Sequence, residues 1–266
     1  MFLYNYICIT MSTASYLSDR INSLSESATL KMTKLGRELA AKGINVISLS
    51  VGEPDFNTPD HVKEAAKKAL DDNFTRYSPV PGYPDLRQAV VNKLKNENNL
   101  DYDISQIVVS TGAKQSLSNV ILTLVNPGDE VIIPTPYWVS YSEMVNLAEG
   151  KSVFINTDIE SNFKITAEQL EAAITPNSKV FMFSSPCNPT GSVYSKEELA
   201  ALVEVFEKHP NIFIISDEIY EHINYIGKHE SIAQKTEIHD RVIIVNGVSK
   251  AYAMTGWRMG YVCGPK

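Results

Sequence analysis

The chain has 266 residues, enough for one large domain or two small ones, and 44% of them are apolar, as in a globular protein with a real core. Its 31 acidic residues outnumber its 24 lysines and arginines, which gives a net charge of −7. This surplus argues against a nucleic-acid surface or an anionic membrane face, so no nucleic-acid or membrane partner is expected. It leaves an anionic substrate open, because the local charge of a site can oppose the net charge.

The three cysteines, Cys8, Cys187 and Cys263, are odd in number and widely spaced. They show neither metal-ligand spacing nor a disulfide framework, so we expect a reducing, cytoplasmic setting and no metal. No apolar run approaches the roughly 18 residues that span a bilayer. Met1–Thr10 lacks the basic start and the cleavage pattern of a signal peptide, and we expect residues 1–13 to be a disordered extension.

Residues 14–43 carry apolar side chains at helical spacing and end at Gly43, which predicts an arm followed by an amphipathic helix. Thr29 belongs to a short run of small residues that would suit a helix N-cap. Val46–Val51 is predicted to be a strand. Gly52 then begins a turn-rich loop, where it either relieves a tight turn or lets a ligand approach the backbone closely.

Strands and helices alternate from about residue 60, which indicates an α/β domain with a largely parallel sheet. Helices are predicted at about 60–70, after 76–87, and at 115–124, 166–174 and 196–207; strands at 107–110, 131–133, 152–156, 180–183, 212–215 and 242–245. Several polar residues follow the strands directly, at the edge where open α/β sheets bind ligands. The proline-rich loop before the second helix suits a site, a subunit contact or a plain connector.

Two of these strand ends are suited to an anion and a flat ring. Gly112, Ala113 and Lys114 lie between a strand and a helix, where free N–H groups and the helix dipole favour an anion. The spacing of this turn is not that of a Walker A loop. Trp138 follows the next strand and either belongs to the core or stacks on a planar ring.

Three further strand ends carry an amide, an acid and an amine. Asn188 either forms a structural turn or donates to a ligand oxygen. Asp217 follows four apolar residues, so it needs a partner or caps a helix. Lys250 is either a solvated lysine or an amine able to form a Schiff base, and Arg258 nearby suits a phosphate. Together the strand ends supply the contacts that pyridoxal phosphate (PLP) requires.

Seven segments form a set that is more specific than any one of them: Gly52–Phe56, Tyr77–Pro79, Gly112–Gln115, Pro136–Tyr141, Asn188–Gly191, Asp217–Tyr220, and Ser249–Lys250 with Arg258. With these segments, the chain after about residue 14 resembles class I, fold-type-I aminotransferases, in particular their bacterial aspartate and aspartate/prephenate branch. The resemblance implies a PLP-transferase fold like that of aspartate aminotransferase. Residues 60–266 would form the large PLP-binding domain, and residues 14–59 an arm and part of an incomplete small domain.

The resemblance also implies roles at the cofactor ring. Lys250 would form the internal aldimine and then move the proton between the substrate Cα and the cofactor. Asp217 would pair with the pyridine nitrogen and keep it protonated. Tyr220 and Asn188 would donate hydrogen bonds to the ring oxygen, and Trp138 would stack on the ring.

At the phosphate, the resemblance implies the turn Gly112–Lys114 together with Arg258. Many relatives have a phosphate-binding serine where this chain has Gly247, and Ser249 is expected to substitute for it. Tyr77 would reach the phosphate of a neighbouring subunit, which implies a homodimer with shared active sites.

The implied substrates are amino acids and 2-oxo acids, contacted by Gly52, Lys114, Trp138, Asn188 and Thr29. Lys114, with Thr29, would bind the distal carboxylate of a dicarboxylic substrate. Relatives continue well beyond the position of Lys266, and the arginine that binds the substrate α-carboxylate lies in that continuation. Residues 1–266 alone are therefore expected to be inactive or unstable.

The resulting prediction is a PLP-dependent transaminase acting between aspartate or glutamate and a 2-oxo acid, prephenate among the candidates. A related PLP enzyme, such as an aromatic or alanine transaminase or a C–S lyase, stays open on the same residues. A non-catalytic PLP-binding regulator would typically carry a fused DNA-binding module, and no basic helix-turn-helix segment is evident at the N-terminus. A phosphate-cofactor module unrelated to PLP would leave Lys250 and Asp217 unexplained.

Overall fold

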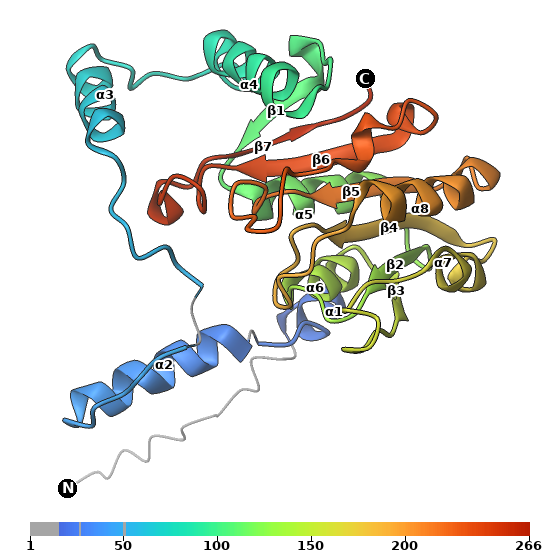
Figure 1. Cartoon of the computed structure of the whole chain (residues 1–266). Helices are drawn as coiled ribbons and strands as arrows, with labels where there is room; N and C mark the ends of the chain where they lie inside the picture. The colour runs from blue at the N-terminus through green and yellow to red at the C-terminus, as the bar shows by residue number, and fades with distance from the viewer. Residues whose placement is uncertain (1–15, 27, 50–51) are drawn as a thin grey trace, which may run out of the picture.

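The computed structural model describes residues 16–26, 28–49 and 52–266. Its centre is a seven-stranded sheet in the order β1-β7-β6-β5-β4-β2-β3 (Figure 1). The strands are β1 (Ile107–Ser110), β2 (Glu130–Pro134), β3 (Lys151–Ile155), β4 (Ser178–Ser184), β5 (Phe213–Asp217), β6 (Val242–Gly247) and β7 (Gly260–Cys263). The predicted α/β fold with a mostly parallel sheet is confirmed.

Parallel pairing runs through β3, β2, β4, β5 and β6, whereas β7 is antiparallel to both β6 and β1. The central strands β4, β5 and β6 are almost entirely buried, as expected for parallel strands that are covered on both faces. Because these three strands are parallel neighbours, their carboxyl ends lie next to each other at one edge of the sheet.

Helices cover both faces of the sheet and enclose two hydrophobic cores. On one face α4 (Pro84–Asn98), α7 (Ala167–Ala173) and α8 (Lys196–Lys208) contribute to a core centred on fully buried Phe181 and Phe206. On the other face α5 (Ala113–Leu124) and α6 (Ser140–Leu147) pack buried Leu117, Ile121 and Tyr141 against the strands. The helices and strands predicted after residue 60 are present, with small shifts at their ends.

The N-terminal part of the described chain is much more exposed. Helix α1 (Asp19–Asn22) lies near α6, while α2 (Ala28–Ala41) and α3 (Asp60–Asp71) stand away from the sheet (Figure 1). The strand predicted at Val46–Val51 is wrong for residues 46–49, which form no strand; residues 50–51 lie outside the described part. Ile47 is 85% and Leu49 93% exposed, and none of the strands in the described residues pairs with this segment.

The expected disordered extension at residues 1–13 also lies outside the described residues. Within the described part of the chain, no helix is long and apolar enough to cross a membrane.

Strand β7 was not predicted from the sequence. It pairs with both β1 and β6, and its start lies against the turn before α5. Its first residue, Gly260, lies directly against the turn that begins α5. A Cβ atom at position 260 would overlap the backbone nitrogen of Ala113 and the carbonyl carbon of Gly112. Only a residue without a side chain allows β7 to pass this close to the turn.

We therefore expect Gly260→Ala to destabilise the fold by about 1–3 kcal/mol, because backbone atoms on both sides must move. Gly256→Ala is the matched control, since a Cβ there meets nothing within 4 Å. The control should change the free energy of unfolding by less than about 0.5 kcal/mol. Urea unfolding of both variants measures the difference, and equal stabilities would contradict the close approach.

Candidate functional site

A cavity of about 870 Å³ lies at the carboxyl ends of the central strands. Most of the residues predicted for the site line it: Thr29, Gly52, Ala113, Lys114, Trp138, Asn188, Asp217, Tyr220, Ser249, Lys250 and Arg258. Two predicted residues do not line the cavity. Gly112 is the N-cap of α5 and adjoins Ala113, which does line it, and Tyr77 is fully exposed in the loop between α3 and α4.

Lys250 enters the cavity from the turn that follows β6. Its Nζ donates to the backbone oxygen of Gly52 at 2.6 Å and lies 5.8 Å from the centre of the Tyr220 ring. Burial lowers the pKa of the amine below its usual value; Glu53 opposes this shift, and Arg258 adds to it. A depressed pKa increases the fraction of neutral amine, which is the form that attacks a carbonyl carbon.

Asp217, the last residue of β5, is 4% exposed. Tyr141 Oη donates to its Oδ2 at 2.7 Å, and the backbone N–H of Ile219 donates to its Oδ1 at 3.3 Å. Burial raises the pKa of this carboxyl to about 6, while the two hydrogen bonds act in the opposite direction. No cation is among the described groups that shift it.

Asp217 therefore is a buried carboxylate without a positive partner among the described residues, and such a group is costly unless a ligand supplies the charge. The alternative that Asp217 caps a helix is wrong, because turns rather than a helix follow it.

Tyr220 and Asn188 lie together on one side of the cavity. Asn188 Nδ2 donates to Tyr220 Oη at 3.4 Å. Burial, followed by the negative charge of Asp217, raises the pKa of the Tyr220 hydroxyl above its usual value. The hydroxyl therefore stays protonated at neutral pH and is available as a donor to a ligand oxygen.

Trp138 and Lys114 form another part of the wall. Lys114 Nζ lies 4.8 Å from the centre of the Trp138 ring, within cation–π distance. Burial and the nearby Arg258 lower the pKa of the Lys114 amine. Trp138 also meets Tyr141 edge to face, at 5.7 Å between ring centres. An aromatic wall beside a lysine suits a ligand with a flat ring and an acidic group.

The start of α5 forms an anion-binding corner. Gly112 has φ +86°, in the left-handed region that favours glycine, and the first N–H groups of the helix follow it. Arg258 reaches this turn from the segment after β6 and donates through Nη2 to Thr111 O at 3.5 Å. A Cβ at Gly112 would overlap the Arg258 guanidinium, so the glycine is what lets the arginine lie against the turn.

These features test whether the cavity suits PLP, and the residues fit it. Lys250 supplies an amine for the aldehyde, and Asp217 a buried carboxylate for a cationic ring nitrogen. The corner at Gly112 and Arg258 supplies an anion site for the phosphate. Buried Ser249, at 8% exposure, adjoins Lys250 in the cavity wall.

Sequence reasoning missed Tyr141 as a site residue. The side chain is 2% exposed, lines the cavity and donates the shorter of the two hydrogen bonds to Asp217. The available signal was its position three residues after Trp138, which lies just before α6; the Tyr141 backbone N–H donates to Trp138 O at 2.9 Å, so a single turn links the two residues. A buried tyrosine hydroxyl needs a partner, and an unpaired acid at a strand end is a natural one.

The sequence matches known proteins over most of its length. Residues 44–266 match the family described as "Aminotransferase class I and II". The chain is 52% identical over 254 residues to a probable aspartate/prephenate aminotransferase of Rickettsia bellii, covering 95% of this chain and 64% of that protein. It is 50% identical over 253 residues to the aspartate/prephenate aminotransferase of Cereibacter sphaeroides, covering 94% and 63%. It thus spans less than two thirds of these relatives' length.

Solved structures agree with the sequence matches. The aspartate aminotransferase from Rhizobium meliloti superposes with a TM-score of 0.91 at 47% identity, covering 94% of this chain and 63% of that one. The aspartate aminotransferase from Thermus thermophilus with maleate gives a TM-score of 0.90 at 44% identity, covering 94% and 64%.

The raised pKa of Asp217 makes the stability of the ligand-free protein depend on pH. Its pKa is 3.8 ordinarily and about 6 in the fold, so between these values the folded chain holds a proton that the unfolded chain has lost. Stability therefore falls as the pH rises from about 4 to about 6 and stays lowered above that.

We expect Asp217→Asn to stabilise the ligand-free protein at pH 8 by up to about 3 kcal/mol, the free energy that this pKa difference represents. The gain should vanish near pH 4. Urea unfolding at both pH values measures this gain. Asp240→Asn is the control, because Asp240 is exposed and its replacement should leave the free energy of unfolding unchanged at pH 4 and at pH 8. A pH-independent effect of Asp217→Asn would show that the carboxyl titrates normally.

Proposed function

The chain belongs to the class I and II aminotransferases, and from that premise we propose that the protein transfers an amino group between aspartate or glutamate and a 2-oxo acid, with PLP as its cofactor. The observation that supports this best is one cavity shared by the Lys250 amine and the buried Asp217 carboxylate, which has no cation beside it among the described residues. An amine that reacts with the aldehyde and an acid that pairs with the ring nitrogen are the two groups on which the cofactor's chemistry depends.

When bound, PLP supplies an electron sink that stabilises negative charge at the substrate Cα. Lys250 moves the proton at that carbon, and its lowered pKa suits an amine that must accept a proton near neutral pH. Asp217 holds a proton at the ring nitrogen. Tyr220 and Asn188 donate to the ring oxygen, and the Trp138 indole keeps water from one face of the ring.

The phosphate would be held by the turn at Gly112 and Ala113, with Lys114 beside it, by Arg258, and by Ser249 in place of the serine found at position 247 in many relatives. Helix α5 contributes its first N–H groups, and Arg258 contributes a forked donor. These groups would hold the cofactor by its phosphate and leave Lys250 and Asp217 to act at the ring.

A second copy of the chain would complete the site. Tyr77 is fully exposed, and its loop also carries Phe74 at 59% and Val80 at 97% exposure. Apolar side chains gathered on one exposed segment are typical of a protein interface. We therefore assign Tyr77 to the phosphate of a neighbouring subunit in a homodimer with shared sites, with residues 14–59 as the arm and part of a small domain, and residues 60–266 as the large domain.

The substrate side of the cavity favours a dicarboxylic acid. Lys114 presents a cation beside Trp138, while Thr29 and Gly52 line the same space. The Thermus thermophilus relative was solved with maleate, which is itself a dicarboxylate. Aspartate, glutamate and their 2-oxo acids carry the second carboxylate that Lys114 would bind, and prephenate, named for the sequence relatives, is a candidate acceptor. We place the reaction in the cytoplasm.

Replacing Lys250 tests the proposed chemistry directly. In the full-length protein, Lys250→Ala should abolish the absorption band of the lysine-bound cofactor and reduce transamination at least roughly 100-fold, because the proton-transfer group is lost. Lys179→Ala is the control, since that lysine lies over Phe213 and does not line the cavity. Normal turnover by Lys250→Ala would refute the proposal.

Replacing Lys114 tests the substrate class. Lys114→Ala should lower kcat/KM for aspartate roughly 10- to 100-fold, as expected when a charged hydrogen bond to a carboxylate is removed. The same change should leave kcat/KM for alanine, which has no second carboxylate, within about twofold. Equal losses for both amino acids would assign Lys114 to the cofactor alone.

A further inference from the structure

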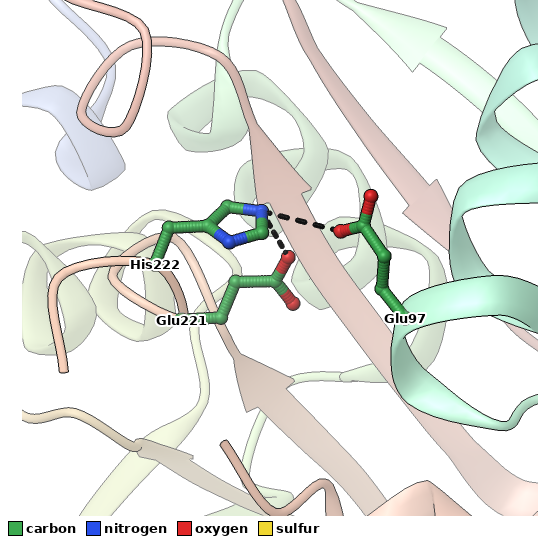
Figure 2. Close-up of side chains that lie close together, drawn as sticks. All are labelled: Glu97, Glu221 and His222. Atoms are coloured by element: carbon green, nitrogen blue, oxygen red, sulfur yellow. Dashed lines mark ion pairs between the residues drawn. The ribbon is translucent and has the colours of Figure 1, made fainter. Parts of the chain in front are cut away.

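A cluster of charged side chains lies behind the cavity, between α4 and the turn that follows β5. His222 Nε2 is 2.8 Å from Glu221 Oε1 and 3.5 Å from Glu97 Oε2 (Figure 2). With Lys93 and Asn98, which also contact Glu221, these side chains are called the clamp below. None of the five lines the cavity.

The donor atoms of Glu97, Glu221 and His222 lie close enough to one another to hold a metal ion. The place between the carboxylates is taken by Lys93, however. Its Nζ contacts Glu221 Oε1, donates to Asn98 Oδ1 at 2.8 Å and lies 3.9 Å from Glu97 Oε2. The ammonium group thus has two hydrogen-bond partners and a second carboxylate nearby, so the lysine serves as the cation of the cluster.

Burial makes the clamp strong. The Glu221 side chain is 3% and that of Lys93 17% exposed. Asn98, itself 4% exposed, donates to Glu221 Oε2 at 3.0 Å, and its backbone oxygen accepts from Gln234 Nε2 at 2.7 Å. A buried ion pair whose remaining lone pairs are satisfied resists opening, because separation leaves an uncompensated charge.

The clamp contacts both loops that carry the central groups of the site. Glu221 directly follows Tyr220, and its backbone N–H bonds to Glu218 O at 3.0 Å within the same turn. The His222 ring meets the Tyr252 ring edge to face at 6.1 Å, and Tyr252 lies two residues after Lys250. Burial, then the charges of Glu97 and Glu221, raise the pKa of the Tyr252 hydroxyl, so the carboxylates of the clamp also act on Tyr252.

We propose that Glu221 and His222 are positioning residues: anchored on α4 through Lys93, Asn98 and Glu97, they fix the loop of Tyr220 and the loop of Lys250 relative to each other. The inference rests on the proposed function, since it concerns the alignment of Tyr220 and Lys250 around one cofactor. Neither side chain reaches the cavity, so both act through their neighbours.

The test uses Glu221→Gln and His222→Asn in the full-length, PLP-loaded protein. The controls are Glu171→Gln and His209→Asn, which alter a more exposed cluster of the same residue types on α7 and at the C-terminal end of α8: His209 Nε2 lies 2.8 Å and Lys208 Nζ 3.5 Å from the Glu171 carboxylate. Three readouts apply, namely the pH at which the absorption band of the bound cofactor changes, steady-state kinetics, and amide hydrogen exchange of the ligand-free protein.

Both clamp variants should raise the pH of the absorption change, because a displaced Tyr220 donates less well to the ring oxygen. We expect kcat to fall roughly tenfold, as for a small misplacement of reacting groups, with KM within about twofold. Exchange should accelerate in peptides covering residues 217–223 and 248–257. The controls should change none of these.

Unchanged absorption pH and exchange in both clamp variants would overturn the inference, as would equal changes in the controls. If Glu221→Gln does not fold, His222→Asn and Glu97→Gln decide the question, because these two side chains are 40% and 47% exposed. A wild-type protein that binds no PLP would refute the proposed function instead, and the exchange readout would still test the clamp.

Discussion

The site depends on a single electrostatic imbalance, the burial of the Asp217 carboxylate without a cation among the described residues. Strand β5 places it there, because the strand is buried along its length and ends at the cavity. The free-energy cost of burying this carboxylate lowers the stability of the ligand-free protein. Under the proposed function, a cofactor with a protonated ring nitrogen would relieve this cost on binding, so part of its binding free energy would be set by the fold.

Sheet topology explains why residues far apart in the chain meet around that carboxylate. Parallel strands β4, β5 and β6 bring Asn188, Asp217 and Lys250 to one edge, since each residue lies at or just after the end of its strand. Antiparallel β7 adds a different constraint. Its first residue, Gly260, lies against the turn before α5, and Arg258 is thereby held beside Gly112.

The sequence was sufficient to predict the groups that stand at strand ends, because an apolar run followed by a polar residue is visible without any contact information. Tyr141 was hidden, since a buried tyrosine on an amphipathic helix resembles any core aromatic until its partner Asp217 is known. The ion pair of Lys93 and Glu221 joins residues 128 apart, which no spacing rule connects. The strand predicted at Val46–Val51 does not form over Val46–Leu49. Local β propensity is not sufficient for a strand where no described strand lies alongside to pair with it.

Three carboxylates within five residues, Asp217, Glu218 and Glu221, are buried, and they differ in the partners that the protein provides. Glu218 accepts hydrogen bonds from Ser216 and Ser231, and His229 Nε2 lies 3.0 Å from it. Although burial lowers the pKa of His229, its hydrogen bond and attraction to Glu218 outweigh that and raise it. The Glu218 carboxylate therefore has its polar partners within the protein.

Glu221 is matched by Lys93 and Asn98. Asp217 alone is left with a tyrosine hydroxyl and a backbone amide, and it alone of the three lines the cavity. A buried carboxylate without a partner of opposite charge is costly. Glu218 and Glu221 both have polar partners within the protein, so the missing positive charge is confined to Asp217 in the cavity. Because Glu218 and Glu221 already have partners within the protein, a cation that enters the cavity would pair with Asp217.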